Sequence, residues 1–70
     1  MPKVEIIDLR SNEKKEVEFE ENEKIEDVLR KAGINPVEVI VKINDEIFPC
    51  EDKMPKDAKR MELIPVISGG

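Results

Sequence analysis

One stretch of the chain has the apolar spacing of an α-helix, and it constrains the fold more than any other feature. The apolar residues of this stretch recur at i, i+3, i+4 and i+7: Ile25, Val28, Leu29 and Ala32. That spacing places them in one stripe along a helix. Asn22 is the expected N-cap, Gly33 stands where a left-handed C-terminal cap belongs, and Pro36 follows the end of the helix.

The rest of the chain has the patterns of β-strands. Nine isoleucines and seven valines give a β-branched excess that favours a sheet. The expected strands are a first one framed by Val4, Ile6 and Leu9, then residues 16–20, 39–43, 46–48 and about 60–66. Ser11-Asn12 and Asn44-Asp45 supply turn residues, and Pro55 excludes a regular strand from the loop 49–59. This order of strands around one helix predicts an α+β domain with the helix across one face of a sheet.

Length and charge argue against several classes of function. With 70 residues the chain is one small domain, expected over residues 1–67. A net charge of −5 and only two aromatic residues argue against a nucleic-acid partner. No apolar run approaches the ~20 residues that span a bilayer, and the amino terminus lacks the pattern of a signal peptide. We therefore expect a monomeric cytoplasmic protein with no membrane partner.

The surface is rich in charge. Charged residues make up 41% of the chain and glutamine is absent, a usage typical of thermophilic proteins, in which ion pairs replace labile side chains. The alternative is a very soluble mesophilic domain. Two i,i+4 pairs on the helix, Glu26–Arg30 and Asp27–Lys31, are expected ion pairs, each worth ~0.2–0.5 kcal/mol.

The residue types needed for catalysis are scarce. Histidine, the commonest general base at neutral pH, is absent. The one cysteine, Cys50, lies between Pro49 and Glu51 in an acidic stretch, so we interpret it as a structural or incidental thiol rather than a functional one. The acidic run 20–23 lacks the spaced ligands of a calcium loop, and a solvated run that favours the start of the helix explains it better. We expect no catalytic residue, no metal site and no bound cofactor.

The C-terminal end is the unusual feature. Ser68-Gly69-Gly70, here called the tail, directly follows a well-patterned strand. A frayed end without a role is one interpretation. In the other, the tail is thin so that it can pass through a narrow enzyme channel to a nucleotide. The α-carboxylate of Gly70, with an ordinary pKa of ~3.3–3.7, is ionised at neutral pH and could attack the α-phosphate of ATP to give an acyl adenylate.

Two long segments of the chain resemble a known family. The run from Val39 to Pro49 and the run from Met61 to Gly70 resemble the ThiS/MoaD sulfur carriers, and equally the small archaeal ubiquitin-like modifiers and the eukaryotic ubiquitin-related modifier. The resemblance implies a β-grasp (ubiquitin-like) fold, with a mixed four- to five-stranded sheet around one helix. It also implies that a separate ATP-dependent adenylating enzyme of the ubiquitin-activating type acts on Gly70. One departure is Asp57-Ala58-Lys59, where the family commonly has Asp-Gly-Asp, so this loop is expected to differ in geometry.

A partner-binding surface is expected along the last strand. Side chains alternate along a strand, so inward positions 41, 43, 61 and 63 leave Ile40, Ile64 and Val66 on the outer face. A sheet register shifted by one residue would reverse this assignment. By the resemblance, the surface that binds the activating enzyme and leads to Gly69 and Gly70 comprises Ile40, Ile64, Val66, Ile67 and Ser68.

Two functions share the adenylation step. In a sulfur carrier, Gly70 becomes a thiocarboxylate that delivers sulfur for thiamin, molybdopterin or tRNA thiolation, and the protein is a co-substrate rather than an enzyme. In a protein modifier, Gly70 is joined to a target lysine through an isopeptide bond. A β-grasp binding module with an incidental Gly69-Gly70 end is the third interpretation. No residue separates the first two, so the sulfur carrier is the prediction and the modifier its alternative.

Overall fold

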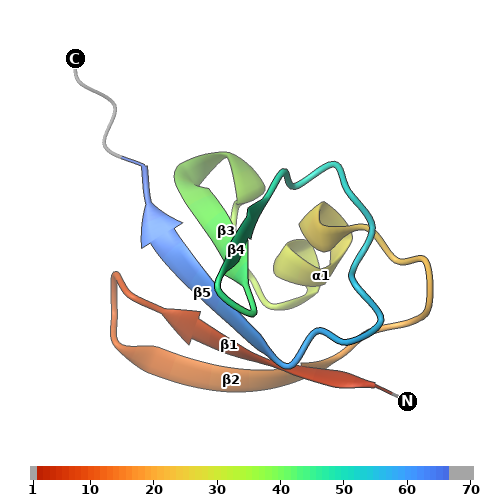
Figure 1. Ribbon diagram of the computed structural model, residues 1–70. Helices are drawn as coiled ribbons and strands as arrows, with labels where there is room; N and C mark the ends of the chain where they lie inside the picture. Colours follow the sequence, from red (N-terminus) through yellow and green to blue (C-terminus); the bar gives the residue numbers. More distant parts are fainter. Residues whose placement is uncertain (1, 67–70) are drawn as a thin grey trace.

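The computed structural model describes residues 2–66 and has one sheet with one α-helix across it (Figure 1). Its elements are β1 (Lys3–Asp8), β2 (Glu13–Glu18), α1 (Ile25–Lys31), the 3-10 helix η1 (Pro36–Glu38), β3 (Val39–Ile43), β4 (Glu46–Phe48) and β5 (Arg60–Pro65). The five strands are ordered β2-β1-β5-β3-β4, with β1 and β5 parallel and the other neighbours antiparallel. This mixed sheet with one helix is the predicted α+β architecture of the β-grasp fold. The expected boundary between domain and tail, at residues 67 and 68, lies outside the described residues.

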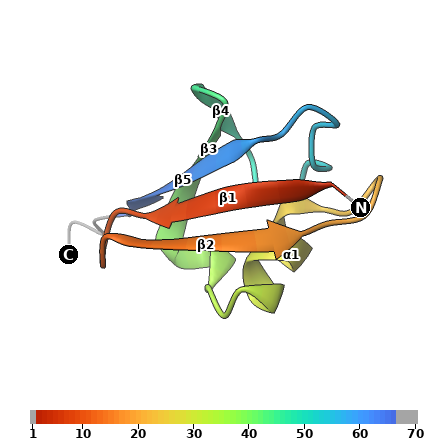
Figure 2. The same cartoon turned by 90° about the horizontal axis from the view of Figure 1, so that it is seen from below.

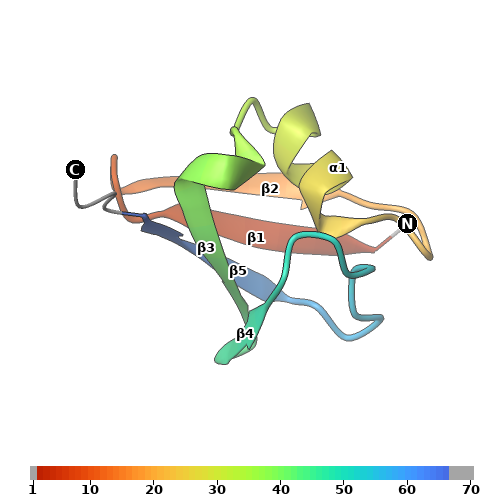
Figure 3. The ribbon, with the colours of Figure 1, turned by 90° about the horizontal axis from the view of Figure 1, so that it is seen from above.

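The helix covers one face of the sheet, and the core lies between them. Figures 2 and 3 show α1 and η1 on the same side of the strands. Side chains buried in this layer come from alternate positions of three strands and from one stripe of α1: Val4, Ile6, Val39, Val41, Ile43, Met61, Leu63, Ile25, Val28 and Leu29. The predicted inward positions of β3 and β5 are therefore confirmed. Among residues 2–66, no helix is long and apolar enough to cross a bilayer.

The helix ends as predicted but begins differently. Gly33 has φ +79°, and the N–H groups of Gly33 and Ile34 donate to the carbonyls of Arg30 and Leu29 at 3.0 and 2.9 Å, which is a Schellman cap. The N-cap assignment of Asn22 is wrong: Lys24 is the N-cap and makes no side-chain cap bond. Asn22 instead adopts a left-handed turn conformation, with φ 70°.

The first helical N–H groups are capped by a distant loop. The N–H of Ile25 donates to the carbonyl of Asp52 at 2.9 Å, and the N–H of Glu26 donates to the carbonyl of Cys50 at 3.0 Å. These bonds satisfy donors that a local side chain would otherwise cap. Because the acceptors lie more than twenty residues away in sequence, the local pattern around Asn22 gave a false N-cap.

One of the two expected helical ion pairs is present. Arg30 lies 3.9 Å from Glu26, as expected, and 3.3 Å from Asp27. The Asp27–Lys31 pair is wrong, since Lys31 is 2.9 Å from Glu23 and also donates to the carbonyl of Glu18. Lys31 therefore ties the helix to the segment that precedes it rather than to its own first turn.

The first hairpin differs from the prediction at its ends. β1 stops at Asp8, and Leu9 is 45% exposed in the turn instead of completing the strand. β2 spans Glu13–Glu18, whereas the predicted strand was 16–20. Its first three residues were predicted as loop, and Phe19, which is buried, follows the strand instead of belonging to it. β2 is an edge strand that pairs only with β1, so its first residues need no apolar alternation. β5 likewise ends at Pro65, one residue before the predicted limit.

The loop that departs from the family pattern is built around an alanine. Ala58 is only 5% exposed and packs in the core, and its N–H donates to the carbonyl of Pro55 at 3.1 Å. The positive-φ residues in the described chain do not include Ala58. This conformation needs no glycine, so alanine fits the loop and adds a buried methyl group.

Candidate functional site

No helix covers the face of the sheet opposite α1 in the part of the chain that the structure describes (Figures 2 and 3). Exposed apolar residues lie near the end of β5. Ile40 and Ile64 are directly paired across β3 and β5. The N–H of Leu9 donates to the carbonyl of Leu63 at 3.2 Å, which holds Leu9 beside this end of β5. Leu9, Ile40 and Val66 are 45%, 40% and 46% exposed, and Ile64 is half-buried. We call Leu9, Ile40, Ile64 and Val66 the open-face patch.

The next row of the same face is mixed in character. Continuous pairing across β1, β5, β3 and β4 aligns Ile7, Glu62, Lys42 and Ile47. Ile47 is 65% exposed, whereas Ile7 is only 9% exposed although it lies outside the main core cluster. The row beyond it places Glu5 beside Arg60. The open face is therefore apolar at the end where β5 stops and charged farther from it.

The chain is held as far as the last described residue. Val39 and Pro65 are the final paired residues of β3 and β5. One step beyond them, the N–H of Val66 donates to the carbonyl of Glu38 at 3.0 Å. The backbone that leads to the tail thus leaves the sheet at a defined point, directly beside the open-face patch.

The structure brings together three of the predicted site residues. Ile40, Ile64 and Val66 lie around the end of β5, on the face opposite the helix. The other predicted site residues lie outside the described residues: Ile67, Ser68, Gly69 and Gly70.

Leu9 and Ile47 extend the apolar surface and were not predicted. Ile47 helps line a shallow, mainly apolar groove between β3 and β4. The Asn44-Asp45 turn could have predicted the position of Ile47 on the open face. A two-residue turn pairs Ile43 with Glu46, and hence Lys42 with Ile47, so Ile47 lies on the same face of the sheet as Lys42. Leu9 had no such signal, because its position depends on a hydrogen bond to the distant β5.

Cys50 lies at the edge of the same groove in a setting that disfavours a thiolate. Burial raises the pKa of its thiol, and the nearby carboxylates of Glu26 and Glu51 raise it further. The sulfur lies 3.7 Å from the carbonyl of Pro36, toward which the thiol points. A protonated, partly buried thiol is a poor nucleophile.

One residue of the acidic run 20–23, Glu23, has a structural role before the helix. Glu23 accepts hydrogen bonds from the N–H of Glu20 at 2.9 Å and from Lys31 at 3.0 Å. Burial alone would raise the pKa of Glu23, but these two donors hold it below its ordinary value. Across residues 2–66, no three His, Cys, Asp or Glu side chains are grouped so that they could hold a metal ion.

Comparison with known proteins assigns this arrangement to a family. The model of the ThiS family matches residues 4–70. The chain belongs to the ThiS family. It is also 36% identical over 62 residues to the sulfur carrier protein TtuB of Thermus thermophilus, an alignment that covers 89% of this chain and 94% of TtuB. Together the ThiS family match and this relative support a ThiS-like sulfur carrier, which is a small carrier protein rather than a catalyst.

Proposed function

We propose that this protein carries sulfur on the C-terminal carboxylate of Gly70. The carboxylate attacks the α-phosphorus of ATP in the active site of a separate adenylating enzyme of the ubiquitin-activating type, and pyrophosphate leaves. A sulfur nucleophile then attacks the carbonyl carbon of the acyl adenylate and AMP leaves; with hydrosulfide the product is the thiocarboxylate. The enzyme supplies the ATP site, and the carrier binds no cofactor of its own. The setting of this exchange is the cytoplasm.

The observation that carries the proposal is the placement of the open-face patch at the end of β5. An exposed apolar cluster of this kind is typical of an interaction surface. Its Ile40–Ile64 pair lies on two adjacent inner strands of the sheet, and Val66 directly follows β5. An enzyme that docks on this patch therefore receives the chain beyond Val66 at its own surface. The charged row with Glu62 and Lys42 would orient the partner.

The acceptor of the sulfur is a second protein or an RNA-modifying system. Thiamin, molybdopterin and tRNA thiolation are the acceptor pathways proposed for this family type, and the described residues do not select one. Conjugation of Gly70 to target lysines shares the adenylate and remains the alternative fate. The partner that receives the acyl adenylate decides between these two fates.

The docking proposal is tested by placing a charge in the open-face patch. Ile64→Glu should lower kcat/KM for ATP–pyrophosphate exchange by the cognate adenylating enzyme about tenfold or more, because a buried hot-spot contact is lost. The loss should appear mainly as a higher KM for the carrier. The same substitution at Val37, which is 80% exposed on η1 and outside the patch, is the matched control and should change little.

Stability separates docking from folding. Ile64→Glu should lower the free energy of unfolding by only about 1 kcal/mol, since Ile64 lies on the open face. Severe unfolding would place Ile64 in the core and contradict the face assignment. Ile40→Glu is the second variant, and normal kinetics in both variants would remove the patch from the interface.

The fate of Gly70 is read from the mass of the protein isolated from its native host. Replacement of one carboxylate oxygen by sulfur adds about 16 Da, and a peptide map must place this mass at Gly70 because oxidation of a methionine or Cys50 gives almost the same shift. Sulfur at Gly70 supports the carrier. Isopeptide-linked species with a Gly-Gly remnant on lysine favour the modifier instead. If the protein never forms an adenylate when it is combined with its adenylating enzyme and ATP, both the carrier and the modifier are excluded and the binding module is the interpretation that stands.

A further inference from the structure

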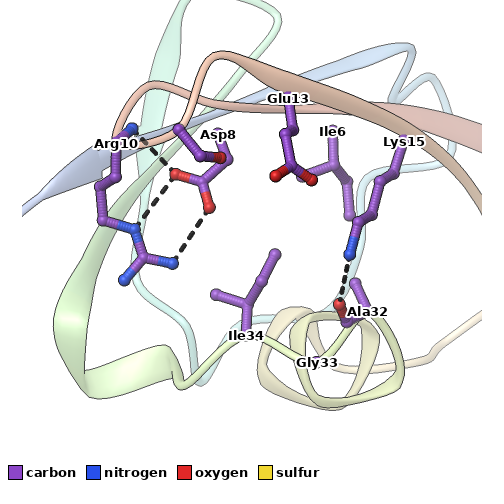
Figure 4. A pocket seen from close by; sticks show the side chains of 9 residues that line it. Ile6, Asp8, Arg10, Glu13, Lys15, Ala32, Gly33 and Ile34 are labelled. Carbon is purple, nitrogen blue, oxygen red and sulfur yellow. Dashed lines mark hydrogen bonds and ion pairs between the residues drawn. The ribbon is translucent and has the colours of Figure 1, made fainter.

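Arg10, in the turn between β1 and β2, joins two carboxylates from distant parts of the chain. Its Nε and Nη2 atoms donate to the two oxygens of Asp8 at 3.1 and 3.0 Å. Its Nη1 atom donates to Glu38 Oε2 at 3.2 Å. Figure 4 shows the two-pronged contact with Asp8 at one side of a polar pocket, where Arg10 turns back over the end of β1. We call Asp8, Arg10 and Glu38 the clasp.

The geometry of the clasp is more constrained than that of an ordinary surface ion pair. A guanidinium that meets a carboxylate through two parallel bonds is fixed in orientation as well as in position. The side chains of Asp8 and Arg10 are only 16% and 33% exposed, while Glu38 is 59% exposed. The hydrogen bond from Arg10 is the main reason that the pKa of Asp8 lies below its ordinary value. Asp8 is therefore ionised at neutral pH, where it pairs with the Arg10 guanidinium.

Glu38 connects the clasp to the end of β5. Its side chain accepts from Arg10, while its backbone carbonyl accepts the N–H of Val66 at 3.0 Å. Glu38 is also the last residue of η1, a three-residue helix that leads directly into β3. A shift of Glu38 would thus move the acceptor that holds the last described backbone group of the chain.

We propose that Arg10 is a positioning residue that, through Glu38, fixes the point at which the chain leaves the sheet toward Gly70. This inference rests on the proposed adenylation of Gly70. A reacting carboxylate gains rate from being delivered in one geometry. The open-face patch provides binding to the partner, and the clasp provides the direction of delivery. The two parts should therefore affect different kinetic constants.

The structural arm of the test uses the isolated protein. Arg10→Ala should speed hydrogen exchange at the amide of Val66, measured by NMR, by about three- to fivefold, which matches the loss of one ordered ion-pair network. Arg30→Ala is the matched control, because Arg30 also contacts two carboxylates, Glu26 and Asp27, but on the exposed side of α1. Its Val66 exchange should equal that of the wild type.

The kinetic arm uses the adenylating enzyme with ATP. Arg10→Ala should lower kcat about two- to fivefold at unchanged KM for the carrier, because an interaction that positions the reacting group has been removed without loss of binding. Arg10→Lys keeps the charge but not the two-pronged geometry, so its kcat should fall to a value between those of wild type and Arg10→Ala. Arg30→Ala should match the wild type in both constants.

The outcomes separate the clasp from the proposed function. A wild-type protein that is never adenylated contradicts the proposed function, while Val66 exchange still decides whether the clasp holds the end of β5. Unchanged Val66 exchange in Arg10→Ala overturns the inference whatever the kinetics show. Faster exchange with normal kcat also overturns it, because the clasp would then be structural only. A rise in KM would assign Arg10 to docking instead.

Discussion

Single side chains connect segments that are distant in the sequence through hydrogen bonds, and Asn44 is the clearest case. It adopts a left-handed conformation with φ 49°, which asparagine tolerates better than most residues. Its side-chain nitrogen donates to the carbonyl of Asp57 at 2.8 Å, and its side-chain oxygen accepts from the backbone N–H groups of Lys59 and Arg60 at 3.2 and 3.3 Å. One turn residue thus fastens the β3–β4 hairpin to the chain that enters β5.

Replacement of Asn44 by glycine isolates these bonds. Glycine keeps the left-handed backbone comfortable, so Asn44→Gly should cost about 1–2 kcal/mol of stability through the lost side-chain bonds alone. Asn12→Gly is the matched control: Asn12 is also left-handed, with φ 59°, and none of the side-chain hydrogen bonds within residues 2–66 involves it. Urea unfolding measures both, and an equal effect in the two variants would contradict the role of the Asn44 side chain.

The carboxylate of Asp8 predicts a dependence of stability on pH. Its folded pKa is lowered below the ordinary value of 3.8, mainly by the hydrogen bond from Arg10. Its stabilisation is therefore fully present above this ordinary value, which applies to the unfolded chain, and is lost as the pH falls through the lower folded pKa. The difference in Tm between wild type and Asp8→Asn should be largest at neutral pH and shrink below about pH 4. A difference that grows in acid would contradict this assignment.

At the scale of elements, α1 shows what a local pattern can and cannot predict. The apolar stripe and the Gly33 cap depend on residues close in sequence, and both are confirmed. The start of the helix is capped by carbonyls of Cys50 and Asp52, which no pattern near Lys24 indicates. Helix type and C-terminus were thus predictable, whereas the N-terminus required the folded loop.

Gly33 gives a prediction at this scale. A Cβ added there would have open space around it, so the cost of Gly33→Ala comes only from the left-handed backbone at φ +79°. We expect a loss of about 1 kcal/mol in the free energy of unfolding. Gly33→Asn should cost less, because asparagine visits this conformation more readily. A much larger loss in the alanine variant, with a changed m-value, would indicate a rearrangement of the helix end.

The strands likewise divide into those whose bounds the local sequence predicts and those whose bounds depend on distant pairing. β3 and β4 match their predicted bounds, since a short apolar run and a two-residue turn define them locally. The edge strand β2 and the end of β1 were misplaced, because their pairing and not their alternation sets their length. For the candidate site, alternation in β3 and β5 was enough to place Ile40 and Ile64 on one face. Leu9 joined it only through contact with β5.

At the scale of the whole molecule, the last strand in sequence is central in the sheet. β5 lies between β1 and β3 and is parallel to β1, so the first and last strands of the sequence lie side by side in the middle of the sheet. β5 is paired on both sides from Met61 to Leu63, and its last two residues, Ile64 and Pro65, pair with β3. The β1–β5 pairing joins residues far apart in the sequence, and such non-local pairing is slow to form during folding.

The final prediction concerns removal of the chain end. Every buried side chain among residues 2–66 precedes Ile64, so deletion of Gly69 and Gly70 should change the free energy of unfolding by less than about 0.5 kcal/mol. Under the proposed function, the same deletion should abolish ATP–pyrophosphate exchange, because the new terminal carboxylate, that of Ser68, stands two residues short of the position of Gly70. Truncation after Lys59 is the opposite control: it removes Met61 and Leu63, both 0% exposed, and should prevent folding. Calorimetry and the exchange assay decide the matter. A large fall in Tm on deleting the two glycines would make them structural, and retained exchange would show that Gly70 is not the group that reacts.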